Sequence, residues 1–284
     1  MGKLYRRVIR FVFSFIVMVF LTNNKVFASG GSWIKSGDQW WYRHSDGSYT
    51  VSDWEYIDGK WYHFDSEGWM ETGWIFTGGY YYLLTSSGDM NTDIYSDSNA
   101  TYRFRGSGEL VDTRLHIIRE KQDNTNWCWA ASSAVVAKYK NDTGRTQESI
   151  VMYVKGQYVN EGGSSNEEGL AIKYASEWNK NAYQSSILTF DEIVERIDQQ
   201  KPILMNVKWL SNDGSVVGWL IDSVTYSGHA VVIAGYQRDE RRIWIMDSWG
   251  NSPTAFFSYS GMINGQQLLR GMAGIMTLLF IRRD

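Results

Sequence analysis

Residues 122–133 read QDNTNWCWAASS and contain Cys128, the single cysteine of the 284-residue chain, with Gln122 six positions before it. A lone cysteine cannot form an internal disulfide, so Cys128 is either a small buried side chain or a thiol kept for chemistry. The run that it opens, residues 128–139, has no Gly or Pro, and its Ala and Val positions recur every three or four residues. This spacing predicts a buried helix. Because a helix N-terminus carries partial positive charge, this position favours the thiolate.

The histidine count narrows the search for a partner of this thiol. Of the four histidines, two lie in an aromatic-rich N-terminal half, and a third, His116, is predicted to begin a strand. The fourth, His229, opens the apolar run 229–234, which is also a predicted strand. A polar ring that enters an apolar strand must find a hydrogen-bond partner. His229 is therefore the candidate base, with an ordinary core histidine as the alternative.

The second half of the chain carries both helix and strand signals. Thr189 and Glu192 form a capping box that predicts a helix ending near Gln200. Apolar runs then predict strands over residues 202–207, 229–234, 243–247 and 273–282. Helices that precede an antiparallel sheet indicate an α+β fold.

Four motifs in this half resemble those of the papain-like cysteine peptidases, including bacterial branches grouped with the bacteriocin-processing and avirulence-effector peptidases. The motifs are Gln122 six positions before Cys128, the helix opening Cys128-Trp129-Ala130, the segment Gly228-His229-Ala230-Val231 with Gly235-Tyr236, and Asp247-Ser248-Trp249-Gly250. The resemblance covers residues 112–284 and implies an α+β papain-like catalytic domain. Two features depart from the family: Asp247 stands where Asn is more common, and the stretch from Cys128 to His229 is shorter than in plant and lysosomal members.

The resemblance implies a Cys-His-Asp triad with a glutamine in the oxyanion hole. Cys128 as thiolate attacks an acyl carbon, and His229 keeps the thiol deprotonated and then protonates the leaving amine. Asp247 holds the imidazole in one tautomer and favours the imidazolium. The side-chain amide of Gln122 and the backbone N–H of Cys128 donate to the oxyanion. Trp249 either shields the His–Asp contact from water or packs in the core.

Aromatic residues recur with a period near 20 between residues 32 and 110. Half of the 14 tryptophans fall in this stretch, and glycines punctuate it at intervals of 20 or 21 (Gly47, Gly68, Gly88 and Gly108). A period of this length is typical of an array of small units that bury a face only by stacking on one another. Asp58-Gly59 lies between two aromatic runs, which predicts a tight turn and a short hairpin for each unit.

These units resemble the cell-wall-binding, or choline-binding, repeats in the pattern Thr72-Gly73-Trp74 and in Gly59-Lys60-Trp61-Tyr62-His63-Phe64 followed by Gly68. In that family, aromatic side chains of neighbouring repeats form a cage for choline on teichoic acids, or a platform for glucan. A quaternary ammonium is attracted to aromatic faces without hydrogen bonds. The candidate ligand residues are Trp54, Trp61, Trp74, Tyr81 and Tyr82. The alternative is that these aromatics only pack the hairpins together, and the sequence does not separate choline from glucan.

Residues 1–28 have the pattern of a secretory signal peptide: a basic front, an apolar run from Phe11 to Leu21 and a small-residue ending at Ala28. An uncleaved N-terminal anchor is the alternative, although the apolar run is short for a membrane span. These residues hold five of the 28 basic residues and none of the 31 acidic ones, so the rest of the chain carries a formal charge of −8. This charge disfavours nucleic acid or anionic lipid as the main partner.

The sequence thus predicts a signal peptide over 1–28, aromatic repeats over 29–111 and a peptidase domain over 112–284. The expected protein is a secreted cysteine peptidase, retained at the wall of a Gram-positive-type bacterium by repeats that bind a wall polymer, and acting on protein or peptide substrates. We expect no nucleic-acid partner, no stable membrane span after signal cleavage, no cofactor and no metal. Two alternatives remain. One is an amidase or endopeptidase that cuts peptidoglycan with the same triad, and the other is a catalytically inactive wall-binding adhesin.

Overall fold

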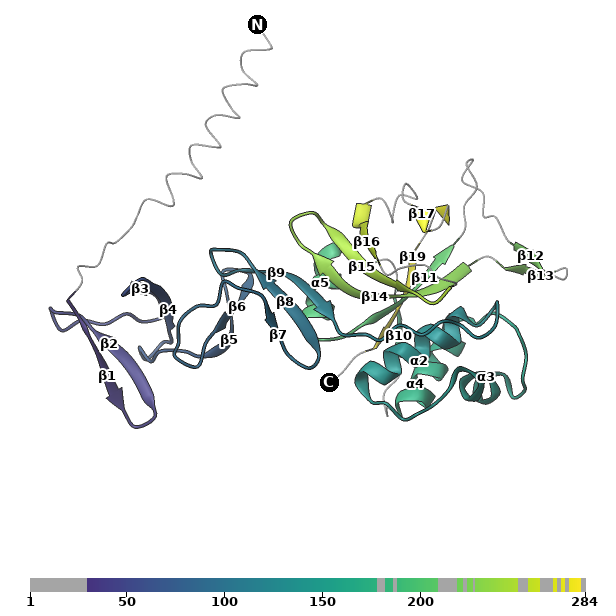
Figure 1. The fold of residues 1–284 in the computed structure, drawn as a ribbon, viewed down its shortest axis with the longest axis horizontal. Helices are drawn as coiled ribbons and strands as arrows, with labels where there is room; N and C mark the ends of the chain where they lie inside the picture. The colour runs from purple at the N-terminus through teal and green to yellow at the C-terminus, as the bar shows by residue number, and fades with distance from the viewer. Residues whose placement is uncertain are drawn as a thin grey trace, which may run out of the picture. The chain divides into compact units, whose positions relative to one another are not determined.

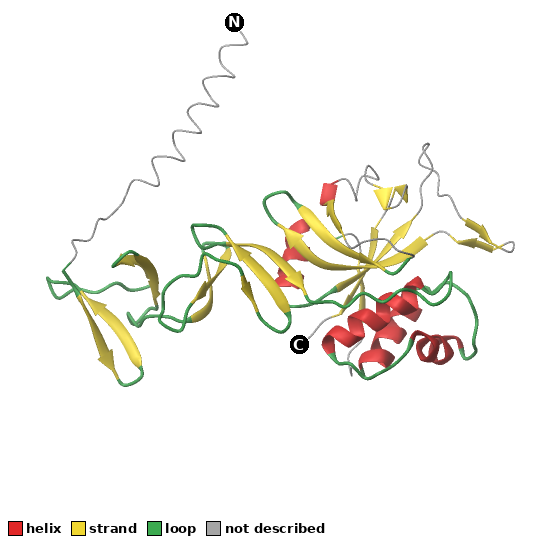
Figure 2. Cartoon of the chain, in the orientation of Figure 1, coloured by secondary structure: helices red, strands yellow, loops and turns green. Residues whose placement is uncertain are grey.

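The computed structural model of the chain describes residues 30–177, 182–185, 188–208, 219–221, 224–226, 228–249, 255–260, 268–269, 272–273 and 276–281. The chain divides into two compact units that meet in the sequence between Asn91 and Thr92 (Figure 1). In the described residues, the N-terminal unit holds strands and loops, and the helices lie in the C-terminal unit (Figure 2). The predicted signal peptide lies outside the described residues.

The N-terminal unit consists of three antiparallel hairpins. Their strands are β1 (Ser32–Ser36), β2 (Gln39–Arg43), β3 (Asp53–Ile57), β4 (Lys60–Phe64), β5 (Gly73–Thr77) and β6 (Tyr80–Leu84). Asp58 and Gly59 join β3 to β4 with φ angles of 48° and 87°. Positive φ at both central residues is the geometry of the tight hairpin turn that the sequence predicts here.

Equivalent contacts join successive hairpins. The backbone N–H of Met70 donates to the carbonyl of Trp40 at 2.7 Å, and Met90 donates to Trp61 at 2.8 Å. The rings of Trp33 and Tyr62 lie 4.8 Å apart, and those of Trp54 and Tyr82 lie 4.9 Å apart. The same contact therefore recurs one unit further along the chain, which explains the period near 20 in the sequence.

The C-terminal unit is mixed α/β and is built on a nine-stranded sheet. The strand order is β10-β19-β11-β14-β9-β8-β7, and β15 pairs with β14 and with β16. These strands are β7 (Tyr95–Ser96), β8 (Ala100–Phe104), β9 (Leu110–Leu115), β10 (Ala182–Ser185), β11 (Ile203–Lys208), β14 (Gly228–Gln237), β15 (Arg242–Asp247), β16 (Ala255–Ser258) and β19 (Met276–Ile281). The predicted strands over 202–207, 229–234 and 243–247 correspond to β11, β14 and β15. Two short pairs lie apart from this sheet: β12 (Trp219–Ile221) with β13 (Val224–Tyr226), and β17 (Leu268–Leu269) with β18 (Met272–Ala273).

In the described residues, the helices that accompany the sheet include α2 (Cys128–Lys140), α3 (Gln147–Lys155), α4 (Ser165–Ser176) and α5 (Phe190–Asp198). In Figure 1, α2, α3 and α4 gather on one side of the sheet. The Ala and Val residues of α2 pack there against Leu204 of β11 and Val232 of β14, in the main core. Both predicted helix starts are confirmed: α2 begins at Cys128, and the Thr189–Glu192 capping box precedes α5.

The fourth aromatic unit belongs to the sheet and not to the hairpin array. β9 pairs with β14, so that Thr113 lies opposite Tyr236, and both side chains donate to the half-buried carboxylate of Asp198 at 2.8 and 2.6 Å. The two compact units therefore divide between residues 91 and 92, and the domain ranges 29–111 and 112–284 stay predictions. The aromatic period continues through the fourth unit, but the strands of this unit pair within the large sheet and do not form a separate hairpin. His116 follows β9 and does not begin a strand.

In the described part of the chain, no helix combines the length and the apolar character needed to cross a bilayer.

Candidate active site

Two buried tryptophans hold the start of α2 on either side of Cys128. The indole N–H of Trp127 donates to the carbonyl of Val159 at 2.8 Å, and that of Trp129 donates to Glu161 at 3.0 Å. Gly163 packs so closely on Trp129 that a Cβ at this position would lie 2.5 Å from the ring. The half-buried Cys128 thus opens the helix from a fixed position. As the first helical residue, it has a backbone N–H without a partner in the helix.

His229 and Asp247 form a buried pair on neighbouring strands. The register of β14 and β15 sets Asp247 opposite Val231, two residues after His229, so the two side chains are diagonal neighbours. His229 Nε2 donates to Asp247 Oδ1 at 2.7 Å. The same oxygen accepts the backbone N–H of Trp249 at 2.8 Å. The carboxylate is therefore held by the turn that follows its own strand.

Trp249 lies edge-on to the His229 ring, with centroids 6.4 Å apart and planes at 89°. Its side chain is 38% exposed. The ring thus lies beside His229 and is partly open to solvent.

The third side chain of this group is Cys128, which lies close enough to His229 to influence the pKa of the imidazole. Burial lowers the pKa of His229, but the hydrogen bonds to Asp247 and Cys128, together with the charges of these groups, outweigh it and raise the pKa to about 10. Because Nε2 binds Asp247, Nδ1 is the ring nitrogen left for the thiol. An imidazolium between a carboxylate and a cysteine stabilises the thiolate.

Gln122 lies close to this group, but its amide points elsewhere. Its Nε2 donates to the backbone carbonyls of Asn124 and Thr125, both at 2.8 Å, and its Oε1 accepts from the Ser248 hydroxyl at 3.1 Å. Both amide hydrogens are therefore engaged within the loop that leads to Cys128. The backbone N–H of Gln122 also donates to the carbonyl of Ser248 at 3.0 Å, so this residue joins that loop to the segment after Asp247.

Two residues that the sequence analysis did not select hold the site together. Arg119 donates from Nε to the carbonyl of Asp247 at 2.6 Å and from Nη2 to that of Trp249 at 3.1 Å. Ser132 donates to the carbonyl of Ala230 at 3.1 Å. Ser132 had a readable signal, since it is a polar residue on the apolar helix, one turn after Cys128. Arg119 had no such sequence signal, because the two carbonyls that accept its hydrogen bonds lie 128 and 130 residues further along the chain.

The five candidate aromatics of the repeats lie in different surroundings. Trp54 and Tyr82 contact each other between successive hairpins and are half-buried. Trp61 is 43% exposed beside Tyr56, and Trp74 is 41% exposed with its ring 6.5 Å from that of Tyr81. The first pair packs the array, whereas the exposed tryptophans are available to a ligand.

Within the described residues, no three or more His, Cys, Asp or Glu side chains gather in a way that could hold a metal ion.

Comparison with solved structures finds choline-binding proteins and wall-lytic enzymes. Choline binding protein F from Streptococcus pneumoniae is 40% identical over 28% of this chain and 27% of that one, with a TM-score of 0.26. The modular Cpl-1 endolysin, complexed with a peptidoglycan analogue, is 28% identical over 32% and 29%, with a TM-score of 0.29. The modular autolysin LytC from Streptococcus pneumoniae is 34% identical over 32% and 21%, with a TM-score of 0.28. The chain thus spans less than a third of each of these proteins, and no curated protein matches it.

Two family models match the chain. The choline-binding repeat covers residues 51–95. The Peptidase_C39 like family covers residues 114–258, which include Cys128, His229 and Asp247. Because this second match spans half of the chain, the protein belongs to the Peptidase_C39 like family.

Proposed function

We propose that the chain is a secreted, wall-associated cysteine peptidase with a papain-like catalytic unit. The observation that carries this proposal is the buried hydrogen bond between His229 and Asp247, with Cys128 at the start of a buried helix and close enough to influence the pKa of His229. Membership of a peptidase-like family supports a hydrolase, and the choline-binding repeat match supports association with the cell wall.

In the proposed reaction, the Cys128 thiolate attacks the carbonyl carbon of the scissile peptide bond. His229 gives its proton to the leaving amine, and a water molecule then hydrolyses the thioester. Asp247 orients the imidazole and stabilises its charged form. The raised pKa of His229 supports a charged imidazolium at neutral pH.

For the oxyanion hole, we propose the backbone N–H of Cys128 as the first donor, because it opens the helix without an intrahelical partner. We retain Gln122 as the second donor. Its amide would first have to leave the carbonyls of Asn124 and Thr125, so we expect its contribution to arise when substrate binds.

The test is covalent labelling of Cys128 by an irreversible thiol-directed peptidase inhibitor, combined with hydrolysis of a casein-like protein. We expect Cys128→Ala to abolish labelling and to lower hydrolysis at least about 10³-fold, and His229→Ala to slow both. Ser133→Ala is the control, since Ser133 lies on the same helix and its hydroxyl has no hydrogen-bond partner among the residues that the structure describes. An unlabelled wild-type enzyme would instead indicate the inactive adhesin.

The repeats favour a second candidate with the same triad, cleavage of peptidoglycan cross-links, because a chain that binds choline-bearing polymers lies on that substrate. Clearing of purified cell walls without hydrolysis of casein would select this alternative.

For the repeats, we propose choline on teichoic acids as the ligand, bound by the exposed faces of Trp61 and Trp74. We expect Trp61→Ala and Trp74→Ala to reduce retention on a choline-bearing resin. Tyr95→Ala, which alters an exposed aromatic outside the three hairpins, should be retained like the wild type. Retention on a glucan matrix, and not on choline, would identify glucan as the ligand.

A further inference from the structure

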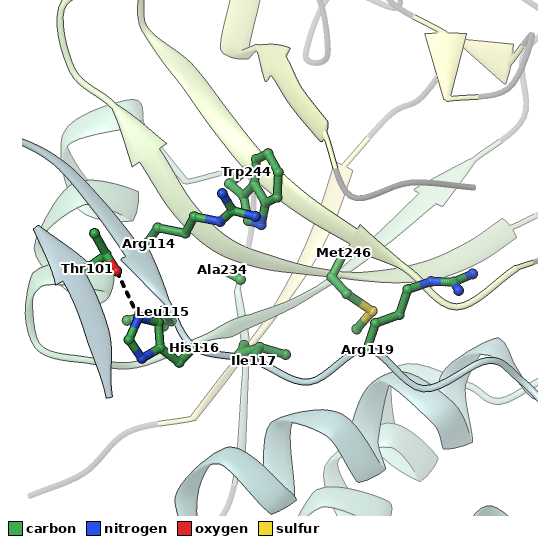
Figure 3. Close-up of a pocket in the computed structure, with 9 residues that line it drawn as sticks. All are labelled: Thr101, Arg114, Leu115, His116, Ile117, Arg119, Ala234, Trp244 and Met246. Carbon is green, nitrogen blue, oxygen red and sulfur yellow. Dashed lines mark hydrogen bonds between the residues drawn. The ribbon is translucent and has the colours of Figure 1, made fainter. Parts of the chain in front are cut away.

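A cavity of about 290 Å³ lies on the C-terminal unit, between the segment that leaves β9 and the strands β14 and β15 (Figure 3). Residues 114–117 and Arg119 form one wall, and Trp244 and Met246 of β15 form the other. The proposed triad does not use this cavity. Its volume is near the lower end of the range for ligand pockets, so only a small group fits.

Apart from Thr101 and the indole of Trp244, the polar side chains that line the cavity are basic. Arg114 lies over the ring of Trp244, with its guanidinium carbon 3.7 Å from the ring centroid (Figure 3). Stacking of this kind fixes the guanidinium plane and leaves its N–H edge open to an acceptor. Among the residues that the structure describes, Arg114 forms no ion pair, although its side chain is exposed.

The remaining lining agrees with an anionic ligand. His116 shares a hydrogen bond of 2.8 Å with Thr101 on the same rim. None of the nine lining residues is acidic, although the chain as a whole carries a formal charge of −3. The lining also includes the buried apolar side chains of Leu115, Ala234 and Met246. The lining therefore offers hydrogen-bond donors and positive charge beside apolar surface.

We propose that this cavity binds a small anion, a carboxylate or a phosphate ester, with Arg114 as its main charged contact. Arginine presents paired N–H groups that match both kinds of anion. Arg119, which also lines the cavity, donates to the backbone carbonyls of Asp247 and Trp249. A bound anion thus lies beside the side chain that holds the backbone of Asp247, and its binding alters the reactivity of Cys128. The proposed anion binding does not depend on the proposed function, whereas the coupling of this binding to Cys128 rests on it.

The test is equilibrium dialysis of the full chain with labelled inorganic phosphate and, separately, labelled acetate, at constant ionic strength in chloride. We expect saturable binding of at least one anion, and the anion that binds identifies the ligand as phosphate-like or carboxylate-like. Arg114→Gln should weaken this binding about tenfold or more, and Arg114→Lys should weaken it less. Arg145→Gln is the matched control, because Arg145 also lies over an aromatic ring, that of Tyr174 at 4.5 Å, outside this cavity.

Absence of saturable binding to the wild type, or equal weakening in Arg114→Gln and Arg145→Gln, overturns the site. Circular dichroism of Arg114→Gln separates loss of binding from loss of fold. For the coupling, a saturating concentration of the bound anion should change the rate of Cys128 labelling at least twofold in the wild type and in Arg145→Gln. An unchanged rate overturns the coupling, whereas a chain that is never labelled contradicts the proposed function and leaves the dialysis result intact.

Discussion

Ser132 donates a 3.1 Å hydrogen bond to the carbonyl of Ala230, and both residues are buried. Ser132 lies four residues after Cys128 and therefore on the same face of α2. Ala230 directly follows His229 on β14. One buried contact thus fixes the helix that presents the thiol against the strand that presents the imidazole, and it does so away from the reacting atoms.

We expect Ser132→Ala to lower the free energy of unfolding by about 1 kcal/mol, since a buried hydrogen bond is lost. It should also slow the labelling of Cys128 severalfold, because helix and strand are then free to shift. Ser133→Ala is the matched control: this neighbouring hydroxyl is buried without a partner in the described residues, so its removal should leave stability unchanged or raise it. Urea unfolding and inhibitor labelling measure both effects. Equal losses in the two variants would show that Ser132 has no special role.

The pKa of His229 predicts how stability varies with pH. It is raised from 6.5 in the unfolded chain to about 10, because the hydrogen bonds and charges of Asp247 and Cys128 exceed the opposing effect of burial. The resulting stabilisation is fully present below pH 6.5. It declines as the pH rises towards 10, since the unfolded chain releases the proton first.

Urea unfolding between pH 6 and pH 10 measures this decline. Asp247→Asn removes one source of the raised pKa, so we expect a smaller decline across this range in the variant than in the wild type. Other groups that titrate in the same range contribute to the free energy of unfolding of both chains, so their contribution is removed when the two declines are subtracted. A decline of equal size in both would contradict the assignment of the shift to Asp247.

The boundary between the two units gives a third prediction. Because β8 and β9 complete the sheet next to β14, a chain that begins at Thr92 should fold cooperatively, whereas one that begins at Asp112 should not. The shorter chain begins inside β9 and lacks β8, the strand that pairs with β9 over five positions. Thermal unfolding followed by circular dichroism distinguishes the two. A cooperative transition of equal midpoint for both would contradict the assignment of this hairpin to the sheet.

The features that the sequence predicted correctly are those encoded locally. Asp58-Gly59 specifies its turn by its own φ preferences, and Thr189 with Glu192 caps α5 through contacts three residues apart. The pairing of β9 could not be predicted, because the aromatic period continues unchanged while this pairing is set by β14, more than 100 residues later. The orientation of the Gln122 amide likewise depends on Ser248 and on local carbonyls, which a motif spacing does not encode.

Helices α3 and α4 were not predicted, although both carry capping signals. Thr146 and Ser164 are N-cap residues whose side chains accept backbone N–H groups, and Ser164 with Glu167 forms a capping box. Their apolar residues are too interrupted to show a clear helical period. The packing of α4 against α2 stabilises a segment that its own sequence marks only at the start.

The last prediction concerns Glu168 of α4, a buried carboxyl group that the proposed mechanism does not use. Burial raises its pKa to about 8, against the lowering effect of a 2.6 Å hydrogen bond from Asn206, while the charge of Glu167 raises it further. The folded chain therefore keeps this proton at neutral pH, whereas the unfolded chain releases it near pH 4.5. Stability is lost as the pH rises from 4.5 to 8.

Glu168→Gln removes this dependence, so it should stabilise the protein by about 2–4 kcal/mol at pH 8 and have little effect at pH 4. Glu167→Gln is the opposing control: its pKa is lowered, despite burial, by the hydrogen bonds with Lys155 and Ser164, so its replacement should destabilise the protein at pH 8. Urea unfolding at the two pH values separates the variants, and a loss of stability at pH 8 in both would show that Glu168 is ionised in the folded protein.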